Sequence, residues 1–203
     1  MNGMLIGGER RFFPSFFYFL YILILVSGVC LSPLQTAAQK SEKEALSRFD
    51  RLAEEATQLN KRGRFDEVIS LLEPHKSDKS NDSALFFNEL GIAYRNRGKL
   101  TEAVQAYREA HARDPQNPVI LNNLGYALYL KKEYPLAIEQ FEKVIQTSPR
   151  FKEAHSNLAL AYYQLQKYDE ALKEIDILLK LDPGHENAKK FRENIRQKIQ
   201  EKK

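Results

Sequence analysis

A period of 34 residues runs through the second half of the sequence and constrains its fold more than any other feature. Five columns of similar residues keep this step over about 100 residues. The columns are Leu90, Leu124 and Leu158; Gly91, Gly125 and Ala159; Ala103, Ala137 and Ala171; Tyr107, Phe141 and Ile175; and Pro115, Pro149 and Pro183. A fixed period of this length indicates stacked helical units, each of which buries its apolar face only against its neighbours.

Each unit is predicted to be a pair of helices. In the first regular unit, one helix face carries residues at three- and four-residue spacing, namely Phe87, Leu90, Gly91 and Tyr94. Gly98 ends this helix, because glycine adopts the left-handed conformation that a helix terminus often needs. Pro115 ends the second helix, because proline lacks the N–H that a helix requires. The small residues Gly91 and Ala103 let the two helices approach closely, with Tyr94 and Tyr107 beside them.

This pattern resembles the tetratricopeptide repeat, whose signature runs large apolar, Leu, Gly or Ala, Tyr, Ala, Phe or Tyr, Ala and Pro. Three regular units match it, at residues 84–117, 118–151 and 152–185. The resemblance implies an all-α fold, a right-handed α-solenoid of tandem helix-turn-helix repeats. It also implies an inner groove, lined mainly by the first helix of each unit, that binds a protein or an extended peptide.

A fourth, degenerate unit is expected at residues 39–83. Gly63 aligns with Gly98, and the apolar face of the first helix would carry Phe49, Leu52, Ala56 and Leu59. Pro74 is expected to cut the second helix short, and residues 77–83 read as a polar loop. A terminal repeat is often atypical, because one of its faces meets water instead of a neighbour.

Residues 186–203 are predicted to form a basic helix that caps the last hairpin. Seven Lys or Arg face three Glu there, beside an apolar stripe of Ala188, Phe191, Ile195 and Ile199. Contact with anionic lipid or nucleic acid is the alternative for such a helix. The whole chain carries a formal charge of +4, so the rest is nearly neutral and charge gives no indication of a nucleic-acid partner.

Residues 1–38 are expected to be an export signal. Arg10 and Arg11 precede an apolar run within residues 16–31, and small residues follow before Ala38. We predict cleavage after Ala38. Retention of residues 16–31 as a signal-anchor is the second interpretation, although 16 residues are fewer than the about 20 that usually span a bilayer. Lipid attachment at Cys30 is the third, and Val29 disfavours it, because bacterial lipoprotein signals carry Gly, Ala or Ser at that place.

Each of these interpretations places the body of the protein across the membrane, because Arg10 and Arg11 favour a cytoplasmic N-terminus. We therefore expect an exported protein of a bacterial type, in the periplasm or on the extracytoplasmic face of the inner membrane. Its expected role is in the assembly of the bacterial envelope. The sequence does not identify the partner.

Positions between the packing columns are predicted to face the groove. The predicted partner-binding residues are Asn88, Arg95, Asn122, Asn123, Tyr126, Tyr129, Asn157 and Tyr163, with Ile92, Ser156 and Leu160 beside them. Asparagine amides donate and accept hydrogen bonds and suit the backbone of an extended peptide, and tyrosines are enriched at interfaces. In the alternative interpretation, Asn123 and Asn157 cap or pack against a neighbouring helix within the stack.

One kind of partner is argued against. Tetratricopeptide domains that clamp a C-terminal carboxylate carry Lys, Asn, Asn, Lys and Arg at set groove positions. The corresponding residues here are Asn88, Ile92, Asn123, Glu153 and Asn157. Only Asn123 matches, and Glu153 reverses a required charge. Binding of chaperone tails by that mechanism is not expected.

An enzyme is not expected, and neither is a cofactor or a metal. The sequence contains no motif of a metalloprotease, a serine hydrolase or a phosphate-binding loop. His155 stands in a large-apolar column, which favours a packed core histidine. The predicted function is a non-catalytic scaffold that binds a peptide or protein in its groove. The alternative is a membrane-anchored assembly factor that acts through its convex face or its basic C-terminal helix.

Overall fold

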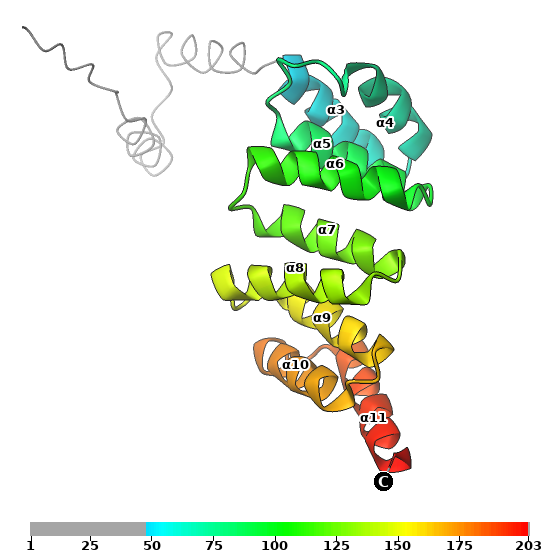
Figure 1. Ribbon diagram of the computed structural model, residues 1–203, viewed down its shortest axis with the longest axis vertical. Coiled ribbons are helices and arrows are strands. Elements are labelled where there is room, and N and C mark those ends of the chain that lie inside the picture. The colour runs from blue at the N-terminus through cyan, green and yellow to red at the C-terminus, as the bar shows by residue number, and fades with distance from the viewer. Residues whose placement is uncertain (1–47, 203) are drawn as a thin grey trace, which may run out of the picture. The chain divides into compact units, whose positions relative to one another are not determined.

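The computed structural model describes residues 48–202, and within this part of the chain every regular element is a helix (Figure 1). The all-α prediction of tandem helix-turn-helix repeats is confirmed. The expected export signal, residues 1–38, lies outside the described residues, as does the start of the degenerate unit. The elements are α3 (Arg48–Lys61), α4 (Phe65–Leu72), the 3-10 helix η1 (Glu73–His75), α5 (Ala84–Asn96), α6 (Leu100–Arg113), α7 (Pro118–Leu130), α8 (Tyr134–Thr147), α9 (Lys152–Gln164), α10 (Tyr168–Leu181) and α11 (Glu186–Glu201).

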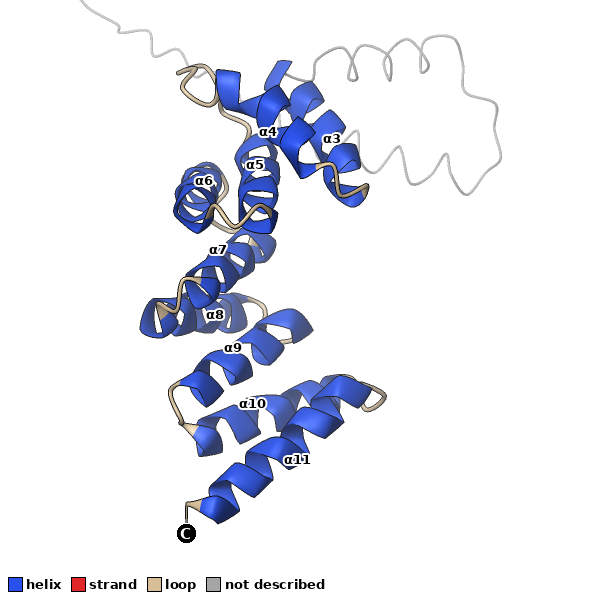
Figure 2. Cartoon of the chain, turned by 90° about the vertical axis from the view of Figure 1, so that its right-hand side faces the viewer, coloured by secondary structure: helices blue, strands red, loops and turns tan. Residues whose placement is uncertain are grey.

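The helices form hairpins that stack in chain order, from α3 and α4 at one end to α10 and α11 at the other (Figures 1 and 2). From α6 onward each helix packs mainly against the helices next to it in sequence, whereas α3 packs against α5 more than against α4. A continuous apolar core runs from α3 to α9, and a second apolar cluster joins α9, α10 and α11. Within residues 48–202, none of the helices has the length and apolar character needed to cross a membrane.

In each of two hairpins, a glycine on the first helix faces an aromatic ring on the second helix. A Cβ atom at Gly91 would lie 2.7 Å from Cε1 of Tyr107, and one at Gly125 would lie 2.6 Å from Cε1 of Phe141. Both rings are completely buried, so they have little room to move aside. The sequence predicted this close approach from the small residues of the column. In the third regular hairpin, Ala159 takes the place of the glycine and Ile175 takes the place of the aromatic residue. The added methyl group of the alanine is thus matched by a smaller side chain opposite it.

The turn between the two helices of each hairpin contains one residue with a positive φ. In the first two hairpins it is glycine, Gly63 at 72° and Gly98 at 74°. In the last two it is Lys132 at 64° and Gln166 at 58°. The shared geometry supports the alignment of Gly63 with Gly98, and it shows that the later turns adopt the same conformation without glycine.

The second helix of the first hairpin is short. Helix α4 has 8 residues, whereas α6, α8 and α10 have 14 each. Pro74 stands in the 3-10 turn that follows it, as the sequence predicted. At a rise of about 1.5 Å per residue, this helix is about 9 Å shorter than the others.

Arg113 fixes the loop that replaces the missing turns. Its Nε donates a hydrogen bond of 3.0 Å to the carbonyl oxygen of Asn81, and its guanidinium lies 4.0 Å from the ring centre of Phe87. Asn81 is only 2% exposed, and the Ser83 hydroxyl accepts from the N–H of Phe86 to cap α5. The loop is polar in sequence, yet part of it is buried.

Helix α11 lies along the last hairpin (Figure 2). The predicted apolar stripe faces the stack, with Ala188 and Ile195 buried and Phe191 and Ile199 half-buried against the second cluster. Nδ1 of His185 accepts a hydrogen bond of 3.2 Å from the N–H of Ala188 and so caps the start of the helix. The charged residues between these positions are exposed or half-buried.

We predict that Gly125→Ala lowers the free energy of unfolding by about 1–3 kcal/mol, the usual effect of overpacking a core. The new methyl group would collide with the buried ring of Phe141. Adding Phe141→Ile should recover much of the loss, because Ala and Ile form the matching pair in the third hairpin. Urea denaturation of the two variants measures both effects. An unchanged midpoint for Gly125→Ala would contradict the close approach.

The hydroxyl of Tyr107 is buried and has no hydrogen-bond partner within the described residues. Tyr107→Phe should therefore raise the free energy of unfolding, by about 1 kcal/mol, because it removes an unpaired polar group. Phe141 already occupies the same column in the next repeat. A loss of stability would show that the hydroxyl has a partner.

The same variant should change the response to alkaline pH. Burial raises the pKa of Tyr107 in the folded protein above its ordinary value of about 10. Above pH 10 the Tyr107 hydroxyl ionises in the unfolded chain but stays protonated in the folded protein. The parent protein therefore loses stability as pH rises through that range. Tyr107→Phe lacks this loss, and its advantage in thermal melts should widen from pH 9 to pH 11.

Candidate partner-binding groove

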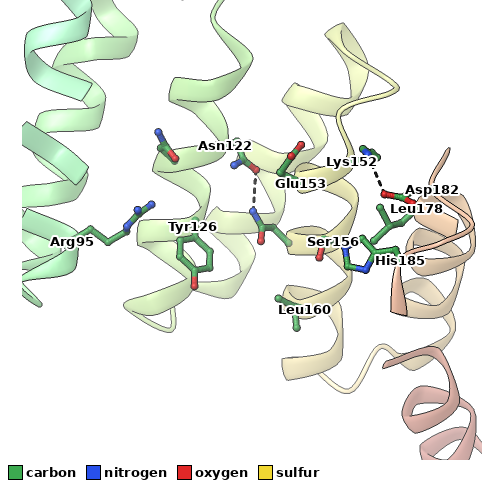
Figure 3. Close-up of a pocket in the computed structure, with 12 residues that line it drawn as sticks. Arg95, Asn122, Tyr126, Lys152, Glu153, Ser156, Leu160, Leu178, Asp182 and His185 are labelled. Atoms are coloured by element: carbon green, nitrogen blue, oxygen red, sulfur yellow. Dashed lines mark hydrogen bonds and ion pairs between the residues drawn. The ribbon is translucent and has the colours of Figure 1, made fainter. Parts of the chain in front are cut away.

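Two pairs of asparagine amides join the first helices of successive repeats. Nδ2 of Asn123 on α7 donates a hydrogen bond of 3.0 Å to Oδ1 of Asn88 on α5. Nδ2 of Asn157 on α9 donates a bond of the same length to Oδ1 of Asn122 on α7 (Figure 3). Asn88 and Asn122 are 7% and 9% exposed, whereas the two donors are half-buried. The alternative interpretation, in which Asn123 and Asn157 pack against a neighbouring helix, describes these contacts, and their contact with a partner stays a prediction.

The first pair continues into a longer chain of buried polar contacts. Nδ2 of Asn88 donates to Oε1 of Glu89 at 3.3 Å, and Nδ2 of Asn60 on α3 donates to the other carboxylate oxygen at 2.7 Å. Glu89 is only 5% exposed. Burial of a carboxylate is costly unless donors surround it. These amides supply the donors and connect α3, α5 and α7.

A cavity of about 440 Å³ opens on this face of the stack, across α5, α7 and α9 (Figure 3). Its wall is mixed in character, with apolar side chains beside amides and charges. It is lined by Arg95, Asn122, Asn123, Tyr126, Lys152, Glu153, Ser156, Asn157, Leu160, Leu178, Asp182 and His185. The volume is within the usual range of ligand-binding clefts.

The charges in this cavity differ in whether they are paired. Lys152 and Asp182 form an ion pair at 3.1 Å, and this ammonium holds the pKa of Asp182 below its usual value. Arg95 makes no ion pair with any described residue, and its guanidinium lies 5.4 Å from the ring centre of Tyr126. Glu153 is exposed, and its carboxylate has no hydrogen bond or ion pair within residues 48–202.

The structure brings together five of the eight predicted groove residues, namely Arg95, Asn122, Asn123, Tyr126 and Asn157. Asn88 is buried beneath Asn123 instead. The ring of Tyr129 stacks on that of Tyr126, with centres 6.0 Å apart, and its hydroxyl accepts from Gln164 of α9 at 3.2 Å.

Tyr163 faces α11. Its hydroxyl donates to Oδ1 of Asn194 at 2.9 Å, and its ring lies 5.2 Å from that of Phe191. Tyr129 thus connects α7 to α9, and Tyr163 connects α9 to α11. Contact of any of these residues with a partner stays a prediction.

The sequence did not identify four lining residues, Lys152, Leu178, Asp182 and His185. The last two flank the turn before α11, and the repeat period carries no information about how that turn folds back on α9. The ion pair between Lys152 and Asp182 links the start of α9 to the end of α10. Lysine and aspartate 30 positions apart give no signal in a single sequence.

His155 is a core residue, as the sequence predicted. It is 2% exposed, with Nδ1 at 2.7 Å from Oε2 of Glu174 and Nε2 at 3.0 Å from the carbonyl oxygen of Pro149. Both ring nitrogens are thus engaged within the third regular repeat. No group of three or more metal-ligating side chains occurs within residues 48–202.

A second cavity of about 460 Å³ lies between α5 and α6, beside the loop that follows the short helix α4. Phe87, Leu90 and Tyr94 form its floor, and Glu102 and Glu109 stand among the polar residues around it. Because α4 ends at Leu72, Lys76 of the following loop lies at this cavity instead of a further turn of helix.

Comparison with known families identifies the class of this protein. A family model described as a TPR repeat matches residues 91–132, and one described as a tetratricopeptide repeat matches residues 128–195. Together they span more than half of the chain. The chain therefore belongs to the tetratricopeptide repeat family, whose domains are protein-interaction modules. No curated protein matches the sequence.

Solved structures support the same conclusion. The first TPR domain of Spaghetti (RPAP3), bound to the HSP90 peptide SRMEEVD, is 28% identical, with a TM-score of 0.57 over 59% of this chain and 95% of that one. PilF of Pseudomonas aeruginosa is 23% identical, with a TM-score of 0.65 over 75% of this chain and 69% of that one. MamA from AMB-1 is 22% identical, with a TM-score of 0.64 over 75% and 82%. The likeness to the last two concerns the fold alone.

Proposed function

We propose that this protein is a non-catalytic scaffold that binds an extended segment of a partner protein in the cavity across α5, α7 and α9. The amide pairs carry the proposal. Asn123 and Asn157 each donate to the preceding repeat, and their Oδ1 atoms accept no hydrogen bond from any described residue. Two carbonyl oxygens at the cavity, one repeat apart, suit the N–H groups of an extended backbone.

The apolar part of the cavity supports the same function. Tyr126 and Leu160 are half-buried and line it from α7 and α9. Partly exposed tyrosine and leucine side chains provide contact area for an apolar side chain of the partner. Side-chain amide acceptors beside an apolar patch fit a protein segment better than a small polar metabolite.

The segment that we propose is an internal one. The solved RPAP3 domain holds an HSP90 peptide, but this chain has Ile92 and Glu153 where carboxylate-clamping domains carry Asn and Lys. An unpaired glutamate at the cavity disfavours a terminal carboxylate by charge repulsion. We therefore do not propose binding of chaperone tails.

Action through the C-terminal helix is less well supported. The apolar stripe of α11 is already packed against α10 and α9, so its remaining surface is polar. An amphipathic helix needs a free apolar face to enter a lipid surface. The groove is the surface that we favour.

The proposal is tested by filling the cavity. Ser156 lines it from α9 and makes no hydrogen bond with any described side chain, so Ser156→Arg should block the cavity without removing a contact. Asn123 is a poorer choice, because its loss would leave buried Asn88 without its donor. We expect capture of partner proteins by the full chain to fall about tenfold, a usual effect of losing a central interface contact.

Ser70→Arg is the matched control, because Ser70 is exposed on α4 and outside the cavity. Equal thermal melts of the two variants would exclude unfolding as the cause. Partners retained equally by Ser156→Arg and Ser70→Arg would contradict the groove proposal.

We also propose that the scaffold acts outside the cytoplasm, in the bacterial envelope. Support comes from the sequence of residues 1–38, with its basic start, apolar centre and small residues before Ala38. The mature chain should begin at Gln39 when recovered from an envelope fraction and sequenced from its N-terminus. A membrane-bound chain that retains residues 16–31 would favour the anchor instead, and an intact chain in the cytoplasm would contradict both.

A further inference from the structure

Two charges in the groove have no ionic partner among the described residues. Lys152 and Asp182 neutralise each other, and Nδ1 of His185 is engaged in capping α11. Arg95 and Glu153 remain, one positive and one negative, both in the wall of the same cavity. Unpaired charges at a binding surface select the complementary charge on a partner.

The two charges stand on different helices with α7 between them. Arg95 lies in the last turn of α5, and Glu153 lies in the first turn of α9. Figure 3 shows Tyr126 and Asn122 of α7 between the two side chains. The two charges therefore differ in position along the helices as well as across the stack. An extended chain, at about 3.3–3.6 Å per residue, needs several residues to reach from one charge to the other.

The side chain of Arg95 is positioned by the ring of Tyr126 in a way that suits binding of an anion. Its guanidinium lies 5.4 Å from the ring centre of Tyr126, and the side chain is half-buried. An arginine stacked on an aromatic ring loses less conformational freedom when it pairs with a carboxylate. Tyr126, between the charges, and Leu160, further along α9, add apolar surface to the same cavity.

We propose that the segment bound in this groove carries an acidic and a basic residue several positions apart, with an apolar residue between them. The acidic residue pairs with Arg95 and the basic residue with Glu153. This inference rests on the proposed function, because it describes the partner of that same groove. It adds the chemistry by which the partner is recognised.

Each charge also suits its own helix end. A cation near the C-terminus of α5 and an anion near the N-terminus of α9 are both favoured by the helix dipole. That local role predicts a change in helix stability when the charge is reversed. It predicts no change in which partner sequence is preferred, so the preference separates the two roles.

The test is selection from a displayed library of random 12-residue peptides on the immobilised full chain. The parent protein should enrich peptides with one acidic and one basic residue at a fixed spacing. Arg95→Glu should enrich peptides with two basic residues, and Glu153→Lys should enrich peptides with two acidic residues. Arg108→Glu, exposed on α6 and outside the cavity, is the charge-matched control for Arg95→Glu and should select like the parent.

A direct affinity measurement completes the test. A peptide selected on the parent should bind Arg95→Glu about tenfold more weakly, and replacing its acidic residue by Lys should restore binding. Peptides that Ser156→Arg no longer binds but that show no charge pattern would overturn this inference and leave the proposed function standing. Selected peptides that Ser156→Arg still binds would overturn both.

Discussion

The contact on which the stack depends is the close approach of two helices at a residue without a side chain. Gly91 faces Tyr107 and Gly125 faces Phe141, each at a distance that admits no Cβ atom. Both rings are fully buried inside their hairpins, so the separation of the two helices has little freedom. A fixed hairpin thickness then brings Asn123 within hydrogen-bonding distance of the preceding repeat. The groove thus depends on packing that lies behind it.

The fold was predictable because packing repeats at a constant step. Leu90, Leu124 and Leu158 are all nearly fully buried, and each owes its position to the same local geometry. Residues outside the regular units were less predictable. Asp182 and His185 reach the groove through the turn before α11, and that turn occurs once. A period observed three times says nothing about a contact made only at the end of the array.

Side-chain orientation within the groove was also beyond the sequence. Asn123 and Asn157 were assigned either to the partner or to the neighbouring helix, and their spacing is the same in both cases. The structure shows the second contact, in which one N–H of each amide is used. An amide has two N–H groups and an oxygen that accepts two bonds. Packing within the stack therefore leaves each side chain able to bind a partner as well.

The hairpin turns reach one conformation by two thermodynamic routes. Gly63 and Gly98 adopt a positive φ without steric cost, but glycine gains more conformational freedom than other residues when the chain unfolds. Lys132 and Gln166 adopt the same positive φ at a steric cost of about 1–2 kcal/mol. In the unfolded chain, these two residues have less conformational freedom than glycine. The N-terminal turns therefore lower stability through the entropy of the denatured ensemble. The C-terminal turns do so through steric strain retained in the native state.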